Sequence, residues 1–460
     1  MWVTLYKSAL YGRPRLDGVD VSRWSPAQIL IATFALLIVG GGLLLSLPVA
    51  SKAEPLGFFQ ALFTATSAVC VTGLLVVDTV AQFTFFGQAV ILVLIQLGGL
   101  GLMTMTTMMA ILLGRRISFR SRLIVQEALN QFSLEGLVRL VKAVGAVTLL
   151  FEGVGALLLS LRFVPAYGWG QGLWYGVFHS ISAFCNAGFD LFGGFRSLSP
   201  YTTDWLVNLV LIVLIVSGGI GFSVIAELWQ KRHRKTRQTL SLHTRLVLLM
   251  TLLLTFIGTI FILLVEWDKA LIKLPLPSKI LAAFFQAVSA RTAGFSTLSL
   301  KGMHEASLLA LLILMFIGSS PASTGGGVKT TTFAVLLALV ISGMRGHDEV
   351  RIFHRRIPND IVKRAVAIIV LSFTLVISLT MLICLVDGLP LQAALLEATS
   401  AFTTVGWSMG VTPTLSPIVK VALCFTMFAG RVGPMSLAFA LAHDRVNARI
   451  SYPEERIIVG

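Results

Sequence analysis

Long apolar segments alternate with short ones along this chain, and no other sequence feature constrains its fold as strongly. Eight segments are long enough to cross a membrane as helices, because about 20 apolar residues span the hydrocarbon core. Within each successive pair lies an apolar segment of about a dozen residues, which is too short to cross. The predicted spans cover residues 29–50, 83–113, 137–161, 205–228, 246–265, 307–341, 361–386 and 418–441, and the short segments cover 58–70, 172–185, 278–291 and 391–403.

Composition places the chain among membrane proteins. Hydrophobic residues make up 56% of its 460 residues, and charged residues only 12%. A water-soluble domain cannot bury so much apolar surface and keep a polar exterior. Each short segment is followed by Gly and small polar residues, and irregular backbone at membrane depth is tolerated only inside protein or beside water. We therefore predict re-entrant half-helices that line a pore or a substrate cavity.

The basic residues predict the orientation of the spans. The formal net charge is +15, but most of the 36 Lys and Arg lie in segments on one side of the predicted bundle. The positive-inside rule then places both termini in the cytoplasm and lets the half-helices enter from outside. Since topology explains the charge, no nucleic-acid partner is expected. The run KRHRKTR (231–237) is either a topology anchor or a docking surface for an acidic partner or anionic lipid.

The four short segments end in similar sequences. They read SAVCVTG (67–73), SAFCNAG (182–188), SARTAG (289–294) and SAFTTVG (400–406), and the third is one residue shorter than the others. A bulky apolar residue follows each final Gly. One copy alone would be weak evidence. Four copies in register, each between two predicted spans, indicate a fourfold internal repeat.

A glycine at the end of each copy suits a cation pathway. K⁺ must exchange its water shell for oxygens, and backbone carbonyls supply them without net charge. Gly adopts the unusual backbone angles that aim successive carbonyls into a narrow path. The preceding half-helix would direct its partially negative carbonyl end toward the same path. The motifs contain no carboxylate, which favours a monovalent cation. The alternative is that these glycines only permit close helix packing.

The sixth predicted span is interrupted. Apolar residues 308–317 are followed by GSSPASTGGGVKTTT (318–332) and then by apolar residues 333–341. Pro and Gly unwind a helix, and the freed polar groups must meet protein or water. We predict an intramembrane gate loop, with a static kink as the alternative. Two cations at membrane depth are either electrostatic gate elements or serve to neutralise a buried carbonyl end or anchor the span. The predicted gate residues are Gly318, Gly325, Gly326, Gly327, Lys329 and, in the last span, Arg431.

Other charged residues near the predicted pore have open roles. Arg291 lies in the third motif, directly before the three residues whose carbonyls and glycine would form a K⁺ filter there, and it would repel K⁺ if it pointed into the path. We therefore expect it to turn back behind the filter, with Glu397 as its partner. Asp78 and Asp190 follow the first two motifs, where they either concentrate cations at the mouth or are ordinary solvated acids.

These features resemble the Trk/Ktr/HKT superfamily of K⁺ transporters. The four Gly-centred motifs, the break in the sixth span and the closing SYPEERIIVG (451–460) carry the resemblance over nearly the whole chain. The membrane subunit of the Ktr branch is the most similar type, because the first predicted span begins near residue 29 and no additional pair of spans precedes it.

The resemblance implies an all-α polytopic membrane protein in which four fused helix–re-entrant hairpin–helix repeats, with eight transmembrane helices, surround a central pore. It implies K⁺ uptake across the bacterial cytoplasmic (inner) membrane, often with Na⁺ as an activator, and no covalently bound cofactor. It also implies a homodimer docked on a cytosolic RCK-type nucleotide-binding ring. The implied K⁺ selectivity filter consists of Val71, Thr72, Gly73, Asn186, Ala187, Gly188, Thr292, Ala293, Gly294, Thr404, Val405 and Gly406. No repeat contains a full TVGYG sequence, so we expect looser selectivity than in a dedicated K⁺ channel.

The predicted organisation divides the chain into four repeats between two cytoplasmic tails. The tails are 1–27 and 443–460, and the repeats are 28–114, 136–229, 243–343 (with the gate loop 318–332) and 361–442.

Two other classes of membrane protein compete with an ion conductor. A secondary transporter of a small solute also uses broken helices, but typically as two inverted repeats around a midplane site. Four parallel repeats fit that plan poorly. A membrane enzyme is not expected, because none of the seven His residues forms a metal-ligand pair within a span and no nucleophile–base pattern is present.

Overall fold

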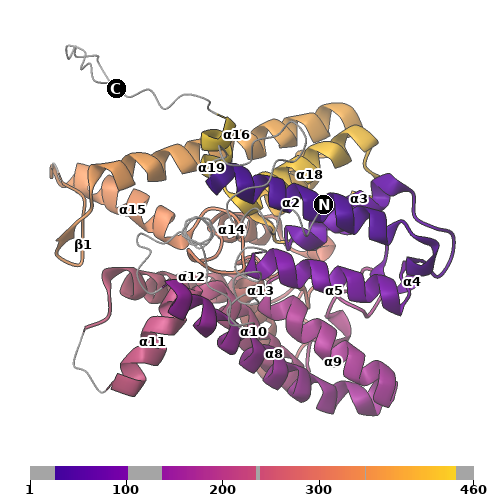
Figure 1. The fold of residues 1–460 in the computed structure, drawn as a ribbon. Coiled ribbons are helices and arrows are strands. Elements are labelled where there is room, and N and C mark those ends of the chain that lie inside the picture. Colours follow the sequence, from indigo (N-terminus) through magenta and orange to yellow (C-terminus); the bar gives the residue numbers. More distant parts are fainter. Residues whose placement is uncertain (1–25, 102–136, 235–238, 348, 442–460) are drawn as a thin grey trace.

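The computed structural model describes residues 26–101, 137–234, 239–347 and 349–441. Within these ranges the chain forms a bundle of long and short helices with one small two-stranded hairpin (Figure 1). The predicted C-terminal tail, almost all of the N-terminal tail, the end of the second predicted span and part of the KRHRKTR run lie outside the described residues.

The helices follow one another in four groups, which we call quarters. The first quarter holds α2 (Pro26–Leu45), α3 (Phe58–Val69), α4 (Thr79–Gln82) and α5 (Phe85–Leu100), and the second holds α8 (Leu137–Tyr167), α9 (Trp169–Phe184), α10 (Trp205–Ile220) and α11 (Phe222–Arg234). The third quarter holds α12 (Leu242–Val265), α13 (Leu276–Ser289), α14 (Glu305–Phe316), α15 (Thr330–Met344) and the antiparallel strands β1 (Arg351–Ile352) and β2 (Arg355–Arg356). The fourth holds α16 (Asn359–Asp387), α17 (Leu391–Thr403), α18 (Pro417–Val432) and α19 (Pro434–Leu441). Short 3-10 turns lie at Pro48–Ala50, Ser199–Tyr201, Leu300–Gly302 and Thr412–Thr414.

Each quarter places a short helix against longer ones. Helices α3, α9, α13 and α17 pack on the first long helix of their own quarter, which is α2, α8, α12 and α16 respectively. Each short helix also packs on a helix of the preceding quarter: α9 on α5, α13 on α10, α17 on α14, and α3 on α18. Because the last of these contacts joins the fourth quarter to the first, the short helices are arranged as a closed ring.

The helices that follow the short ones begin at polar caps. The side chain of Thr84 accepts a hydrogen bond from Gly87 N at the start of α5, and Asp204 accepts one from Val207 N at the start of α10. His304 and Ser416 occupy the same position before α14 and α18. A side-chain acceptor at this position satisfies a backbone N–H that has no partner inside the helix.

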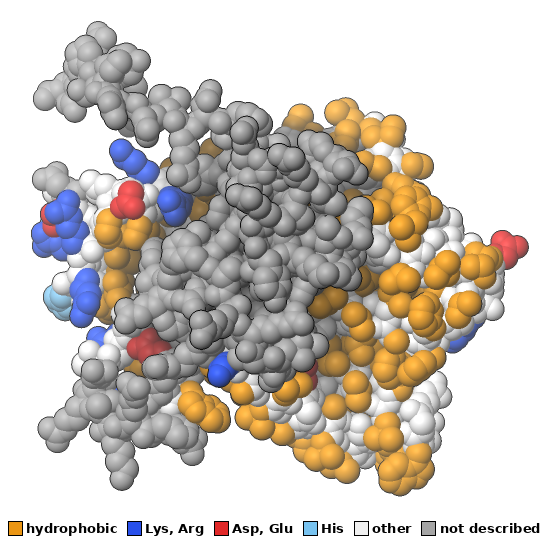
Figure 2. All heavy atoms as spheres, viewed as in Figure 1, with side chains coloured by type: hydrophobic (Ala, Val, Ile, Leu, Met, Phe, Trp, Pro, Cys, Tyr) orange, Lys and Arg blue, Asp and Glu red, His pale blue; other side chains and the backbone are white. Residues whose placement is uncertain are grey.

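Four described helices are long and apolar enough to cross a membrane, and the bent pair α10 and α11 raises this number to five. Helices α3, α5, α14 and α15 are apolar but shorter. The surface agrees with a membrane protein. Figure 2 shows hydrophobic side chains over the face that carries α3, α5 and α9, whereas Lys and Arg gather at the opposite end, near β1. The count of eight spans remains a prediction.

Besides the sixth span, whose interruption was predicted, two predicted spans are not continuous helices. The span predicted at 205–228 bends by 97° at Gly221, and the span predicted at 418–441 breaks at Gly433. Both glycines have positive φ (+101° and +95°), a backbone conformation that ends an α-helix and that Gly adopts at little cost. The gate loop is also shorter than the predicted 318–332, because α15 already begins at Thr330.

Candidate functional site

The glycines that end the four sequence motifs meet at one place. Each lies against the carbonyl that precedes the motif glycine of the next quarter, and the order closes on itself. A Cβ atom added to any of them would lie closer to that oxygen than the 3.4 Å at which ordinary contact begins. The distances from the added Cβ are 2.5 Å from Gly73 to Ala187 O, 3.0 Å from Gly188 to Ala293 O, 2.1 Å from Gly294 to Val405 O, and 2.1 Å from Gly406 to Thr72 O.

Backbone angles repeat around this ring. All four glycines have positive φ, between +68° and +90°. The residue two positions earlier also has positive φ in every quarter, although it is not Gly: Val71, Asn186, Thr292 and Thr404. Such angles are costly for residues with a side chain and persist only where the surroundings impose them. Their recurrence at four equivalent positions indicates a common local backbone structure.

The Ser that opens each motif holds this backbone in place, a role that the sequence analysis did not assign. Ser67 and Ser400 accept hydrogen bonds from the N–H of Gly73 and Gly406, each at 3.0 Å. Ser182 donates to Phe189 O at 2.8 Å, and Ser289 donates to Phe295 O. The Ser was visible in all four motifs, and its recurrence was the signal that could have predicted this role.

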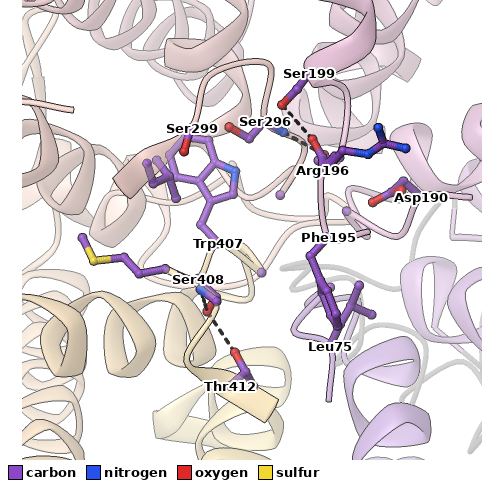
Figure 3. A pocket seen from close by; sticks show the side chains of 18 of the residues that line it. Leu75, Asp190, Phe195, Arg196, Ser199, Ser296, Ser299, Trp407, Ser408 and Thr412 are labelled. Atoms are coloured by element: carbon purple, nitrogen blue, oxygen red, sulfur yellow. Dashed lines mark hydrogen bonds between the residues drawn. The ribbon is translucent and has the colours of Figure 1, made fainter. Parts of the chain in front are cut away.

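The four glycines line one cavity of about 420 Å³, and Figure 3 shows other side chains that line it. Its walls come from the segments that follow the motifs in all four quarters, including Leu75, Asp190, Ser296 and Trp407. The eight other predicted filter residues are buried, with 0% of their surface exposed. The structure therefore places the four predicted filter glycines at one cavity and buries the other eight predicted filter residues directly before them in the chain.

The irregular segment between α14 and α15 lies against the other part of the motifs. The N–H of Gly326 donates to Thr404 Oγ1 at 3.1 Å, and a Cβ on Gly325 would lie 2.1 Å from Thr292 Oγ1. The hydroxyl of Thr324 donates to Phe184 O at 3.1 Å. This segment, residues 317–329, which we call the intramembrane loop, thus touches the ring at residues that the cavity does not reach.

Both predicted gate cations bind carbonyl oxygens of this region. Lys329 Nζ donates to Gly325 O at 2.7 Å, within the loop. The guanidinium of Arg431 donates to Gly98 O at 2.5 Å and Gly99 O at 2.7 Å, and also to the carbonyl of Thr324. Arg431 therefore connects the intramembrane loop to the end of α5. The other predicted gate glycines belong to the same loop, with Gly318 packed on Gly326 O and Gly327 on the backbone of Thr403.

Arg291 does not pair with Glu397, and that expectation was wrong. Its guanidinium turns to α12, where it reaches the backbone and hydroxyl oxygens of Thr251 at 3.4 Å. Glu397 instead accepts hydrogen bonds from the hydroxyls of Ser408 and Thr412, in its own quarter. Asp78 caps α4 and also accepts a hydrogen bond from Gly194 N, whereas Asp190 is 8% exposed and borders the cavity.

Three further glycines pack directly on the short helices. A Cβ on Gly98 would lie 1.9 Å from Val69 O, one on Gly218 would lie 1.9 Å from Phe184 O, and one on Gly430 would lie 1.7 Å from Phe402 O. They open the related sequences GGLG (98–101), GGIG (218–221) and GRVG (430–433), whose last glycine ends α5, α10 and α18. This second repeat was present in the sequence and was missed.

Short helices whose carboxyl ends converge on a ring of carbonyls, inside an apolar helical bundle, define a class of membrane proteins that pass cations. Comparison with known proteins identifies the particular group. The family described as "TrkH: Cation transport protein" matches residues 16–448, and the chain belongs to this family.

Several relatives are similar over nearly their whole length. The Ktr system potassium uptake protein B of Bacillus subtilis is 42% identical over 95% of this chain and 97% of its own. The protein of the same name from Vibrio alginolyticus is 39% identical over 96% of each chain. The potassium/sodium uptake protein NtpJ of Enterococcus hirae is 37% identical over 95% of this chain and 98% of its own. These relatives are transporters rather than enzymes, which agrees with the class predicted from the sequence.

The fold also matches a solved structure. The crystal structure of the potassium transporter TrkH from Vibrio parahaemolyticus aligns with a TM-score of 0.73, covering 94% of this chain and 87% of that one. At 17% sequence identity this match establishes the fold alone.

Proposed function

We propose that the chain carries K⁺ into the cell across the bacterial cytoplasmic membrane, through a filter formed by its four glycine motifs. One observation carries the proposal: Gly73, Gly188, Gly294 and Gly406 form a closed ring in which each glycine lies against a carbonyl of the next quarter. A ring of backbone carbonyls replaces the water shell of a cation without adding net charge.

The chemistry of the ring favours a monovalent cation. None of the twelve filter residues is charged, so the attraction comes from carbonyl dipoles and from the carboxyl ends of α3, α9, α13 and α17. Divalent ions usually require carboxylate ligands. The names of the relatives point to potassium, and in one case to potassium and sodium. In this proposal Na⁺ is an activator and K⁺ the transported ion.

Residues 317–329 are the proposed gate. The loop contacts the motifs at Thr404, which does not line the cavity, and Arg431 fastens the loop to the end of α5. Opening would require two contacts to break: the hydrogen bond between Gly326 and Thr404, and the hydrogen bond between the Arg431 guanidinium and Thr324 O. The proposed architecture has eight spans in four repeats around this path, with both termini in the cytoplasm.

The proposed partner is a cytosolic nucleotide-binding ring, bound to a homodimer of this chain. The hairpin β1–β2 supports this proposal, because it projects from the basic end of the molecule (Figures 1 and 2). It exposes Phe353, which is 44% exposed, next to three arginines, two of which pair with Glu349. An exposed aromatic side chain among basic residues is suited to an acidic protein surface.

Uptake of ⁸⁶Rb⁺ into liposomes that contain the purified full-length protein tests the proposal. We expect uptake that K⁺ competes for more strongly than Na⁺. A folded protein that moves no Rb⁺, either alone or with its cytosolic partner, would refute the proposal. Uptake of a small organic solute in the same vesicles would point instead to a secondary transporter.

A further inference from the structure

Arg291 is a buried cation for which the described residues supply no carboxylate. Only 8% of its surface is exposed. Its guanidinium reaches two oxygens of Thr251 at 3.4 Å, beyond the usual range of about 2.7–3.2 Å, and its Nε has no acceptor among the described residues. No Asp or Glu oxygen in the described part of the chain lies within 4.0 Å of it. A buried charge is costly unless an opposite charge or enough hydrogen bonds compensate it.

Arg431 shows by comparison what a well-supplied guanidinium looks like in this protein. It donates to two carbonyls at the end of α5 and to one in the intramembrane loop. Arg291 lies beside the end of a different helix, α10, but there the loop supplies the donors, since Ser320 N donates to Gly219 O at 3.1 Å. The carboxyl end of α10 therefore does not replace an acceptor for Arg291.

A cavity of about 20 Å³ lies next to Arg291, between the second and third quarters. Helices α10, α12 and α13, which surround it, pack on one another (Figure 1). Its walls are the last turns of α10, Val288 of α13, Thr251 and Thr255 of α12, and Ser319 of the intramembrane loop. One water needs about 10–15 Å³, so the cavity admits a single small ligand and excludes polyatomic anions such as sulfate or phosphate.

The threonine hydroxyls in this cavity have protons to donate. A threonine hydroxyl inside a helix often donates to the carbonyl four residues earlier, as Thr259 does to Thr255 O at 2.7 Å. Neither Thr251 nor Thr255 makes that bond, and among the described residues their hydroxyls donate to no acceptor. A guanidinium has donors on every nitrogen and accepts nothing. Donors that lack acceptors around a small cavity are arranged as ligands of an anion.

We propose that Arg291, Thr251 and Thr255 bind a chloride ion in this cavity. The single negative charge of chloride balances the guanidinium, and the two hydroxyls supply further donors. A monatomic ion has no preferred direction of hydrogen bonding, which suits donors that come from two different segments of the chain. A water molecule would accept a hydrogen bond from Arg291 but would leave its charge uncompensated.

The bound anion would remove a repulsion from the ion path. Arg291 directly precedes Thr292 of the proposed filter, and it is the only charged residue in the four motifs. A positive charge so near the ring raises the energy of a K⁺ ion there, and an anion beside the guanidinium cancels most of this effect. This consequence rests on the proposed function, whereas the site itself does not.

The first test measures thermal unfolding of the purified full-length protein as KCl replaces potassium gluconate at constant K⁺ concentration. A ligand that binds only the folded state raises the melting temperature with its concentration. We expect chloride and bromide to stabilise the wild type and Arg291→Gln to lose this response. The control is Lys420→Gln, which should respond like the wild type, because Lys420 binds Pro413 O at 2.8 Å and does not line the cavity.

A matched pair of threonine variants tests the hydroxyls and does not depend on the folding of Arg291→Gln. Thr255→Val keeps the charge of Arg291 and removes one donor, so the chloride concentration that gives half the shift should rise about tenfold. Thr259→Val, in the same helix, should leave it unchanged. No chloride response in the wild type, an equal response in Arg291→Gln, or an unchanged value in Thr255→Val would overturn the site.

Anomalous diffraction from crystals of the full-length protein grown in bromide would locate the ion. We expect an anomalous peak beside the Arg291 guanidinium and Thr255 Oγ1. A water molecule alone at this place, or bromide only at other places, would overturn the site.

Uptake separates the site from the proposed function. In liposomes, ⁸⁶Rb⁺ uptake by the wild type and by Lys420→Gln should be about threefold faster in chloride than in gluconate, whereas uptake by Arg291→Gln should be equal in both. Chloride-dependent stabilisation with no Rb⁺ uptake in any condition would preserve the site and reject K⁺ transport. Wild-type uptake that is equal in chloride and gluconate would overturn the effect of the anion on the ion path.

Discussion

The glycine ring is regular, whereas the layer beneath it is not. This layer lies on the side of the ring away from the cavity and consists of the ends of α5, α10 and α18 and of residues 317–329. In the ring, the four quarters repeat positive φ angles at the same positions, and the motif Ser binds the backbone at or directly after the glycine in each quarter. Beneath it, α5, α10 and α18 each end at a single glycine, whereas the third quarter inserts residues 317–329 between α14 and α15. In the proposed pathway, an ion at the centre of the ring would meet backbone groups from all four quarters, whereas past the ring it would meet a loop from the third quarter alone.

The difference extends to the charges. The second residue is Gly99 in GGLG and Gly219 in GGIG, but in GRVG it is Arg431. The one arginine therefore faces the one loop, and Thr324 is common to both the contact with Arg431 and the contact with α9. We infer that the regular ring determines which ion passes and that the irregular layer determines when it passes.

The largest effect is expected from a change in the ring. Gly406→Ser would place a side chain 2.1 Å from Thr72 O at a backbone φ of +90°, so the ring must widen or distort. We expect preference for K⁺ over Na⁺ to fall about tenfold or more, because discrimination depends on the number and spacing of the carbonyls. Competition of K⁺ and Na⁺ with ⁸⁶Rb⁺ uptake in liposomes measures it.

The control for this change is Gly153→Ser, in the membrane helix α8. A Cβ at Gly153 meets no atom within 4 Å, so insertion and selectivity should both be preserved. Normal discrimination in Gly406→Ser, with the protein correctly folded, would contradict the assignment of the ring as the filter.

The second effect concerns the layer beneath. Removal of residues 323–325 deletes Thr324 and the carbonyl that Lys329 binds, and it shortens the loop under Thr292. We expect Rb⁺ uptake without the cytosolic partner to rise about fivefold, with unchanged ion preference, because the closed state loses its contacts. A deletion that alters preference but not rate would invalidate the division between the two regions.

The regular region could be predicted from sequence because its repeats carry a local signal. Four glycines after four short apolar segments predicted the filter residues, and the structure brings the predicted residues together, although their role stays a proposal. The apolar periods also located the long helices, although ends differ by several residues. Pro321 and the run of glycines after it predicted the interruption in the third quarter.

Long-range contacts were not predictable in the same way. The partner of Arg291 depends on which helix passes behind the third motif, and this is α12 rather than α17. The bend at Gly221 was missed because GGI lies in an otherwise continuous apolar run, where hydropathy alone does not reveal a turn. The role of the motif Ser could not be predicted, because it depends on where the glycine N–H or the carbonyl of the following residue points in the folded chain.

A smaller effect is expected from Arg431→Gln. Glutamine is too short to bind Thr324 O and Gly99 O together, so the loop loses one of its attachments while those to Thr404 and Phe184 remain. We expect Rb⁺ uptake without partner to rise about threefold, less than in the deletion. The control is Lys420→Gln in the same helix, since Lys420 binds Pro413 O at 2.8 Å and touches no loop residue. Equal effects of the two variants would show that the charge of α18, and not the loop attachment, matters.

The smallest effect is expected at the mouth, above both regions. Asp190 lies in the loop after α9, and burial raises its pKa to about 6. The nearby charge of Asp78 also raises this pKa, whereas the hydrogen bond from Phe192 N and the charge of Arg196 lower it. Asp190 is therefore mostly ionised at pH 7.5 and mostly neutral at pH 5, so a negative charge at the cavity wall is lost as the pH falls through 6. We expect Rb⁺ uptake at low ionic strength to fall about twofold between pH 7.5 and pH 5, because an acidic mouth concentrates cations. In 0.5 M choline chloride, which screens the charge, uptake should no longer depend on pH in this way. Asp190→Asn should flatten the profile, whereas Asp204→Asn, at the start of α10, should not. If Asp190→Asn keeps the wild-type profile, the pH response arises below the mouth, and the ring and the loop are then the places to search for it.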